Sequence, residues 1–196
     1  MSDDNGAGTG AKVGLGMAHG RFQIFHRDHV RYVLAAKQRC HHLLVGITSP
    51  DPAGAPSEPA APHRKDPAAN PLTYYERMAM ISSCLYAEGL SGREFDIVPF
   101  PIESPGELGN YAPLDAVHFL TVYDAWGEEK TARLRGLGYH AEVLWHSAHK
   151  EISGSRIRTA MAAGEDWEHL VPVATRDFLI AHHIPARVAT RMTGAR

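Results

Sequence analysis

The largest concentration of chemically useful side chains lies in residues 18–33, AHGRFQIFHRDHVRYV, which follow a short apolar stretch. Gly20 lets the backbone come close to a ligand, and the planar guanidinium of Arg21 suits a phosphate group. His26 and His29 are three residues apart at the expected start of a helix, so both project from its first turn. Because the N–H groups and the dipole at a helix start attract anions, this stretch predicts a phosphate-binding site.

A metal site is the alternative explanation of these two histidines. A zinc site needs at least three protein ligands, so the pair would be half of one. The nearest further ligand, Asp28, is on the same turn but points elsewhere if the helix is regular. We therefore expect no metal site built from protein ligands.

A second anion-binding segment is predicted in residues 151–161, EISGSRIRTAM. Ser153 and Ser155 are good N-cap residues, and their hydroxyls can hold phosphate oxygens together with the N–H groups of the next turn. Arg158 lies one turn further along and can reach the same anion. A plain helix cap also explains the serines, but the pair of histidines upstream favours a phosphate.

The elements that must position these residues alternate between strands and helices. Short apolar runs predict strands, and apolar residues at helical spacing predict helices. We expect strands at 13–17, 43–48, 95–100, 117–122 and 141–145, and helices at 28–38, 73–88, 128–137, 155–163 and 167–182. This order is typical of an α/β fold, a parallel sheet flanked by helices on both faces.

The domain organisation follows from the same pattern. Residues 1–11 are expected to form a flexible N-terminal tail, 12–183 one domain, and 184–196 a C-terminal tail. Within the domain, residues 50–71 are rich in proline and alanine, which predicts a mobile surface loop. Ligands of such sheets bind beyond the carboxyl ends of the strands, which is where residues 18–33 begin.

Composition excludes several classes of function. The chain has 196 residues, of which 44% are hydrophobic and 21% charged, so one well-buried domain is expected. A formal charge of −2 and a pI near 6.7 argue against non-specific binding to nucleic acid. No apolar run is long enough for a membrane span, and there is no signal-peptide pattern. With only two cysteines, Cys40 and Cys84, we expect a cytoplasmic protein.

Four segments resemble one enzyme superfamily in the same order. GRFQIFHRDH is similar to the GRFQPFHxGH signature of nucleotidyltransferases with the H-x-G-H motif, especially archaeal-type nicotinamide mononucleotide adenylyltransferases. EISGSRIRTAM resembles their second signature, I-S-x-[ST]-x-I-R, and NPLTYYERMAMI (70–81) and GEDWEHLVP (164–172) resemble two further segments. The resemblance implies a Rossmann-like domain that joins a nucleoside monophosphate to a phosphate-bearing acceptor and releases pyrophosphate.

The resemblance also implies roles for individual residues. The catalytic residues it implies are Arg21, His26, His29 and Arg158, and the nucleotide-binding ones are Gly20, Phe22, Gln23, Ser153, Ser155 and Ile157. TVYDAWGEEK (121–130) looks like the GDDWxGK stretch of glycerol-phosphate-type cytidylyltransferases, which adds Asp124, Trp126 and Lys130 near the nucleotide. Mg²⁺ is expected to bind mainly through the triphosphate.

The acceptor site has weaker signals. His63, Arg64 and Lys65, in the expected mobile loop, offer cationic groups that suit a compact anionic acceptor, and Tyr111 is the candidate aromatic residue. The pattern favours a CTP-dependent cytidylyltransferase with a small phosphate or phosphonate acceptor, as in phosphonate natural-product pathways. The first alternative uses ATP and nicotinamide mononucleotide. The oligomeric state stays open, with a homo-oligomer as one option.

One departure from the signature affects the site directly. Asp28 replaces the glycine of H-x-G-H, and Ile24 replaces the proline before it. Beside phosphates a carboxylate is repelled, so Asp28 must turn away, contact a sugar hydroxyl or help to hold the metal. If it does none of these, the chain is a catalytically silent nucleotide-binding protein, which is the second alternative.

Overall fold

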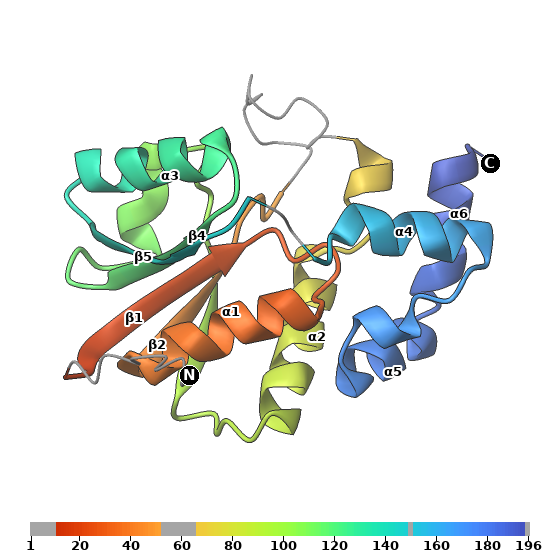
Figure 1. The fold of residues 1–196 in the computed structure, drawn as a ribbon, viewed down its shortest axis with the longest axis horizontal. Coiled ribbons are helices and arrows are strands. Elements are labelled where there is room, and N and C mark those ends of the chain that lie inside the picture. The colour runs from red at the N-terminus through yellow and green to blue at the C-terminus, as the bar shows by residue number, and fades with distance from the viewer. Residues whose placement is uncertain (1–10, 52–65, 149–150, 195–196) are drawn as a thin grey trace, which may run out of the picture.

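The computed structural model describes residues 11–51, 66–148 and 151–194. Figure 1 shows a central sheet with helices packed on both sides. The strands are β1 (Val13–Gly20), β2 (Cys40–Ile47), β3 (Phe95–Pro99), β4 (Val117–Val122) and β5 (His140–His146). The helices are α1 (Arg27–Gln38), α2 (Tyr74–Ala87), α3 (Ala125–Gly136), α4 (Gly154–Ala163), α5 (Val173–Ala181) and α6 (Ile184–Thr193), with 3₁₀ turns η2 (Pro67–Ala69), η3 (Pro105–Asn110) and η4 (Glu168–Leu170).

All five strands are parallel, in the order β3-β2-β1-β4-β5. Successive side chains of a buried strand point to opposite faces, so β1 contributes Met17 to one core and Ala18 to the other. The larger core lies beneath α1, α2 and the C-terminal helices, and the smaller one lies beneath α3 and η3. The predicted fold class, a parallel sheet flanked by helices on both faces, is confirmed.

Local signals explain most element boundaries. Thr73 caps α2 as expected, since its hydroxyl accepts the Glu76 N–H (3.2 Å) while the Glu76 carboxylate accepts the Thr73 N–H (2.8 Å). α3 begins three residues earlier than predicted because the Asp124 carboxylate accepts the Gly127 N–H and caps it there. The helix expected at 167–182 is instead η4 followed by α5, and Pro172 separates the two.

Residues 184–196 were expected to form a C-terminal tail, but residues 184–193 form the helix α6. Ile184 and Val188 are one turn apart and both are buried, so α6 has an apolar stripe that packs against α4. Pro185 at the helix start is compatible with this, since its missing N–H has no partner in a first turn. Among the described residues, no helix is long and apolar enough to cross a membrane.

Candidate active site

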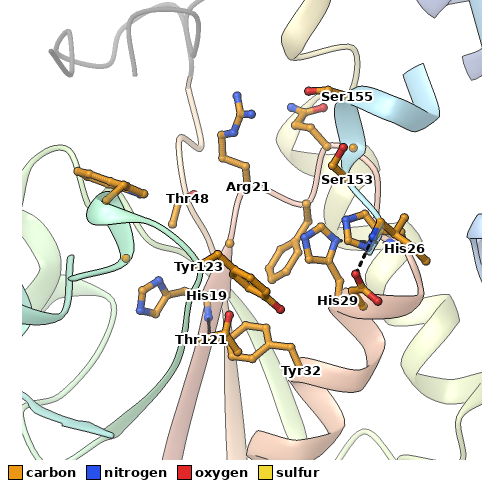
Figure 2. A pocket seen from close by; sticks show the side chains of 18 of the residues that line it. His19, Arg21, His26, His29, Tyr32, Thr48, Thr121, Tyr123, Ser153 and Ser155 are labelled. Carbon is orange, nitrogen blue, oxygen red and sulfur yellow. Dashed lines mark hydrogen bonds between the residues drawn. The ribbon is translucent and has the colours of Figure 1, made fainter. Parts of the chain in front are cut away.

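A cavity of about 410 Å³ opens where β1 and β4 separate (Figure 2). The two strands are paired from Gly16 and Val117 up to Ala18 and Phe119. Beyond that point Tyr32 of α1 lies between them: its hydroxyl accepts the His19 N–H (3.0 Å) and donates to the Phe119 carbonyl (2.6 Å). Because β1 is followed by β2 on one side and paired with β4 on the other, this is the switch point where ligands of such sheets bind.

The cavity brings together most of the residues predicted from sequence. These lining residues are Gly20, Arg21, Phe22, Gln23, His26, His29, Asp124, Trp126, Lys130, Ser153, Ser155 and Arg158. Asp28, the departure from the signature, also lines the cavity. The other lining residues were not selected from sequence: His19, Tyr32, Thr48, Ile102, Thr121, Tyr123, Gly127, Ile152 and Gly154.

His26 and His29 stand side by side at the start of α1. His26 is the N-cap residue and is buried, and the ring centroids are 3.6 Å apart with an angle of 18° between their planes. The backbone N–H of His26 donates to Nδ1 of His29 (3.4 Å). A neutral His29 ring therefore carries its proton on Nε2, a form that donates a hydrogen bond to a phosphate oxygen.

Aromatic rings hold His29 from the side of the core. The Phe22 ring meets it edge to face at 5.0 Å, and Phe25 stacks on it at 5.7 Å. Phe22 has a positive φ of 51°, which places its ring above Gly20. A Cβ at Gly20 would lie 2.8 Å from this ring, so the glycine is needed for packing as well as for the predicted approach to a ligand.

The second predicted segment is joined to the first by direct contacts. Gly154 packs so closely on the Gln23 carbonyl that a Cβ there would lie 2.6 Å from the oxygen. The same carbonyl accepts a hydrogen bond from Nη1 of Arg158 (2.5 Å), whose Nη2 donates to the Ser155 hydroxyl (3.2 Å). Ser153 caps α4 by accepting the Arg156 N–H, so the N-termini of α1 and α4 meet at one cavity.

Asp28 adds a further link between the two segments. Its Oδ2 accepts the backbone N–H of Ile152 at 2.9 Å, across 124 positions of sequence. The carboxylate thus binds the residue immediately before the cap of α4. This contact with the backbone was not among the outcomes considered from sequence.

The charges that line the cavity favour an anion. Arg21, Lys130 and Arg158 are cationic, whereas the lining carboxylates, Asp28 and Asp124, both accept backbone N–H groups. Arg77 lies behind Arg21 and is fully buried, and its pKa is lowered to about 10, first by burial and then by Arg21. Both guanidinium groups are therefore charged at neutral pH, which makes this end of the cavity electropositive.

α3 contributes the predicted residues Asp124, Trp126 and Lys130 to the opposite wall. Asp124 caps the helix, and the Trp126 ring lies under the guanidinium of Arg133, 5.2 Å from its centroid. Tyr123, just before the cap, accepts a hydrogen bond from the Trp145 indole (3.3 Å). These contacts hold the aromatic rings of Tyr123 and Trp126 in the wall of the cavity that α3 provides.

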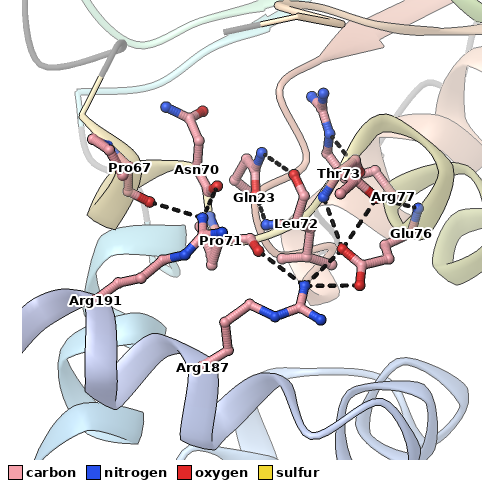
Figure 3. Close-up of polar contacts among 10 residues, drawn as sticks. All are labelled: Gln23, Pro67, Asn70, Pro71, Leu72, Thr73, Glu76, Arg77, Arg187 and Arg191. Atoms are coloured by element: carbon pink, nitrogen blue, oxygen red, sulfur yellow. Dashed lines mark hydrogen bonds and ion pairs between the residues drawn. The ribbon is translucent and has the colours of Figure 1, made fainter. Parts of the chain in front are cut away.

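Gln23 lines the cavity and is held by polar contacts with the segment before α2, which Figure 3 shows. Its side-chain amide donates to the Leu72 carbonyl (2.9 Å) and accepts the Leu72 N–H (3.0 Å), so it holds the segment before α2. Arg187 of α6 donates to both Glu76 oxygens and to the Pro71 carbonyl, and Arg191 donates to the Asn70 carbonyl. α6 is thus part of the frame around the site.

Several predicted site residues are placed elsewhere. Ile157 is fully buried in the larger core and does not line the cavity, because it belongs to the apolar face of α4. Tyr111 ends η3 and also lies outside the cavity lining. His63, Arg64 and Lys65 lie outside the described residues. In the part of the chain that the structure describes, no group of three or more His, Cys, Asp or Glu side chains could hold a metal ion.

Comparison with known proteins agrees with this geometry. The profile of the cytidylyltransferase-like family matches residues 17–160. A phosphonoformate cytidylyltransferase of Streptomyces viridochromogenes is 47% identical over 162 residues, which are 83% of this chain and 88% of that protein. A nicotinamide-nucleotide adenylyltransferase of Thermococcus kodakarensis is 28% identical over 169 residues, 85% of this chain and 82% of that protein.

A solved structure confirms the fold. A bifunctional NMN adenylyltransferase/ADP ribose pyrophosphatase from Francisella tularensis superposes with a TM-score of 0.62 at 12% identity, covering 92% of this chain and 53% of that one. The chain therefore spans about half the length of that structure, which has also been solved with AMP and a manganese ion. The predicted resemblance to nucleotidyltransferases is confirmed by the profile and the relatives, and the chain belongs to the cytidylyltransferase-like family.

Proposed function

We propose that this chain transfers the cytidylyl group of CTP to a small phosphonate and releases pyrophosphate. The observation that carries the proposal is the meeting of two helix N-termini, those of α1 and α4, with Arg21 at one electropositive cavity. Such a site suits a polyphosphate. The name of the Streptomyces viridochromogenes relative, a phosphonoformate cytidylyltransferase, supports CTP and a phosphonate as the two substrates.

The proposed reaction needs no nucleophile from the protein. A phosphonate oxygen, already anionic at neutral pH, attacks the α-phosphorus of CTP in line; the new P–O bond forms as the bond to the β-phosphate bridging oxygen breaks. The enzyme orients the two reactants and neutralises the charge that develops on pyrophosphate. We assign His26 and His29 to the phosphates at the reacting centre and Arg21 to the triphosphate.

The α4 segment has two tasks in this proposal. Ser153, Ser155 and the N–H groups that follow them bind the distal phosphates. Arg158 also has a structural task, because its Nη1 donates to the Gln23 carbonyl and so holds α4 against the first segment. Ile157 supports α4 from the core and does not touch the nucleotide.

The cavity suits a divalent metal that is carried mainly by the nucleotide. Both carboxylates of the lining accept backbone N–H groups, so triphosphate oxygens and water would supply most ligands of Mg²⁺. When bound, the ion neutralises phosphate charge and helps to orient the leaving group. The protein's own contribution is the set of cationic and N–H donors around it. We further propose a cytoplasmic location, where the buried thiols of Cys40 and Cys84 stay reduced.

A second candidate function is adenylyl transfer from ATP to nicotinamide mononucleotide. The Thermococcus kodakarensis relative, a nicotinamide-nucleotide adenylyltransferase, favours it. The silent alternative is weaker, because the Asp28 carboxylate, although it lines the cavity, has a structural task in binding the Ile152 N–H.

Pyrophosphate release with each of the four nucleoside triphosphates separates these functions. We expect turnover with CTP and a small phosphonate such as phosphonoformate, and little with ATP and nicotinamide mononucleotide. Turnover with only the latter pair would refute cytidylyl transfer. Nucleotide binding by calorimetry without any turnover would indicate the silent protein.

Replacing Asp28 tests whether its link to Ile152 organises the site. Asp28→Ala removes the acceptor of the partly buried Ile152 N–H, and we expect kcat/KM for CTP to fall about 10- to 100-fold. Asp28→Asn keeps an acceptor oxygen in nearly the same shape and should retain most of the activity. Steady-state kinetics of both variants measure this, and equal loss in the two would mean that the charge, not the hydrogen bond, matters.

A further inference from the structure

Two buried histidines on the α3 side of the sheet have ring nitrogens that make no hydrogen bond within the described residues. His19 is 2% exposed and His118 is 0% exposed, and no ring nitrogen of either has a hydrogen-bond partner among the described residues. Their rings meet edge to face with centroids 5.6 Å apart, and Phe100 packs on both. Buried polar groups in native proteins nearly always have a partner, so these rings require an explanation.

Only one of this pair borders the cavity. His19 lines it, whereas His118 does not. The His19 backbone is fixed by its N–H donating to the Tyr32 hydroxyl, so the ring has a defined place at the end of β1. In Figure 2 this ring lies on the other side of Arg21 from Ser153 and His26. A partner for His19 can therefore enter from the cavity, at a point away from the proposed triphosphate site.

The charge state of this region defines which partner fits. Burial lowers the pKa of His19 well below its usual value, and the nearby Lys130 ammonium lowers it further. The same two causes lower the pKa of His118 to about 4. Both rings are thus neutral at pH 7, and His19 can donate one ring N–H beside the positive charge of Lys130, which lines the same cavity.

A carboxylate supplies the acceptor that the His19 ring lacks and also suits the positive charge of Lys130. It accepts the imidazole N–H and pairs with the ammonium, and charge-assisted hydrogen bonds of this kind are stronger than neutral ones. A cytosine ring is uncharged and gains less from the lysine, although it can also accept from an imidazole. The neutral ring N–H of His19 beside the ammonium of Lys130 therefore favours a ligand with an acidic group at this place.

We propose that His19 and Lys130 bind a carboxylate of the acceptor, while its phosphonate faces the α-phosphate of the triphosphate that Arg21 holds. This inference rests on the proposed function and deepens it: the name of the Streptomyces viridochromogenes relative supplies a carboxylated phosphonate as acceptor, and the inference assigns the side chains of this chain that recognise the carboxylate. His19 is thereby a specificity residue of the acceptor site, outside the signature motifs.

Two acceptors that differ in the carboxylate test the inference. Phosphonoformate carries it and methylphosphonate does not. With His19→Leu, we expect the KM for phosphonoformate at saturating CTP to rise about 10- to 100-fold. The KM for methylphosphonate, and the KM for CTP at saturating acceptor, should stay within about threefold. Lys130→Met should also raise the KM for phosphonoformate more than the KM for methylphosphonate; its KM for CTP is not part of the test, because Lys130 is also expected near the nucleotide. His118→Phe is the matched control, because it changes a buried ring that does not reach the cavity.

Calorimetric titration of the same two acceptors keeps the test independent of turnover. If no acceptor is turned over, the proposed function fails, but selective loss of phosphonoformate binding in His19→Leu still supports the carboxylate site. Equal loss for both acceptors, or no loss, would overturn it. A raised KM for CTP alone would assign His19 to the nucleotide and also overturn it. If His19→Leu does not fold, Lys130→Met and His19→Gln decide by the same measurements.

Discussion

His26→Asn is expected to lower kcat by about 10²- to 10³-fold and to leave the protein folded. His26 is the N-cap residue of α1, and its buried ring stacks on His29 at the edge of the cavity. Removing one group that stabilises developing charge in a transition state typically costs this much in rate. Asparagine is among the best N-cap residues, so it replaces the position of His26 in the helix without replacing its imidazole.

The comparison with His26→Ala separates catalysis from folding. Alanine removes both the ring and any capping group, so it should show the same fall in kcat and an additional loss of stability of about 1 kcal/mol. Thermal unfolding and pyrophosphate release are measured on the same preparations. A His26→Asn protein with kcat within tenfold of the wild type would remove His26 from the reacting centre.

Sequence reasoning succeeded where a local pattern carried the information. β4 was predicted with its observed limits, and the Thr73 capping box marked the start of α2. The predicted site residues of both signature motifs, apart from Ile157, line one cavity although about 125 positions separate the motifs. These predictions depend on the periodicity of apolar residues, on helix-capping residues and on the spacing of motifs, all of which can be read from one sequence.

The contacts that were missed join residues far apart in the sequence. The Tyr32 hydroxyl holds β1 and β4 apart, and Asp28 binds the N–H of Ile152, but no spacing in the sequence shows either pairing. His19 belongs to a strand and was passed over among thirteen histidines. The helix α6 had a local signal, Ile184 and Val188 one turn apart after a possible start at Pro185, yet it is too short to stand out without its partner α4.

The framework behind the cavity depends on a buried arginine that no motif interpretation assigned to the site. Arg77 of α2 is fully buried, and its guanidinium donates to the carbonyls of Arg21 (2.9 Å), Thr48 (2.9 Å) and Ser49 (2.8 Å). These carbonyls belong to the segments that follow β1 and β2. A single side chain thus holds the two loops that form the base of the cavity.

Arg77→Met is expected to lower the free energy of unfolding by about 3 to 5 kcal/mol, because it leaves several buried carbonyls without donors. Arg77→Lys should recover only part of this, since an ammonium cannot reproduce the fork that reaches both loops. The control is Arg176→Met: Arg176 lies on α5 and pairs with Asp177 at the surface, so its loss should change stability by less than about 1 kcal/mol. Urea denaturation measures all three. If Arg77→Met unfolds at the urea concentration of the wild type, the guanidinium does not hold these loops, and the cavity must be shaped by Gln23 and the α6 contacts alone.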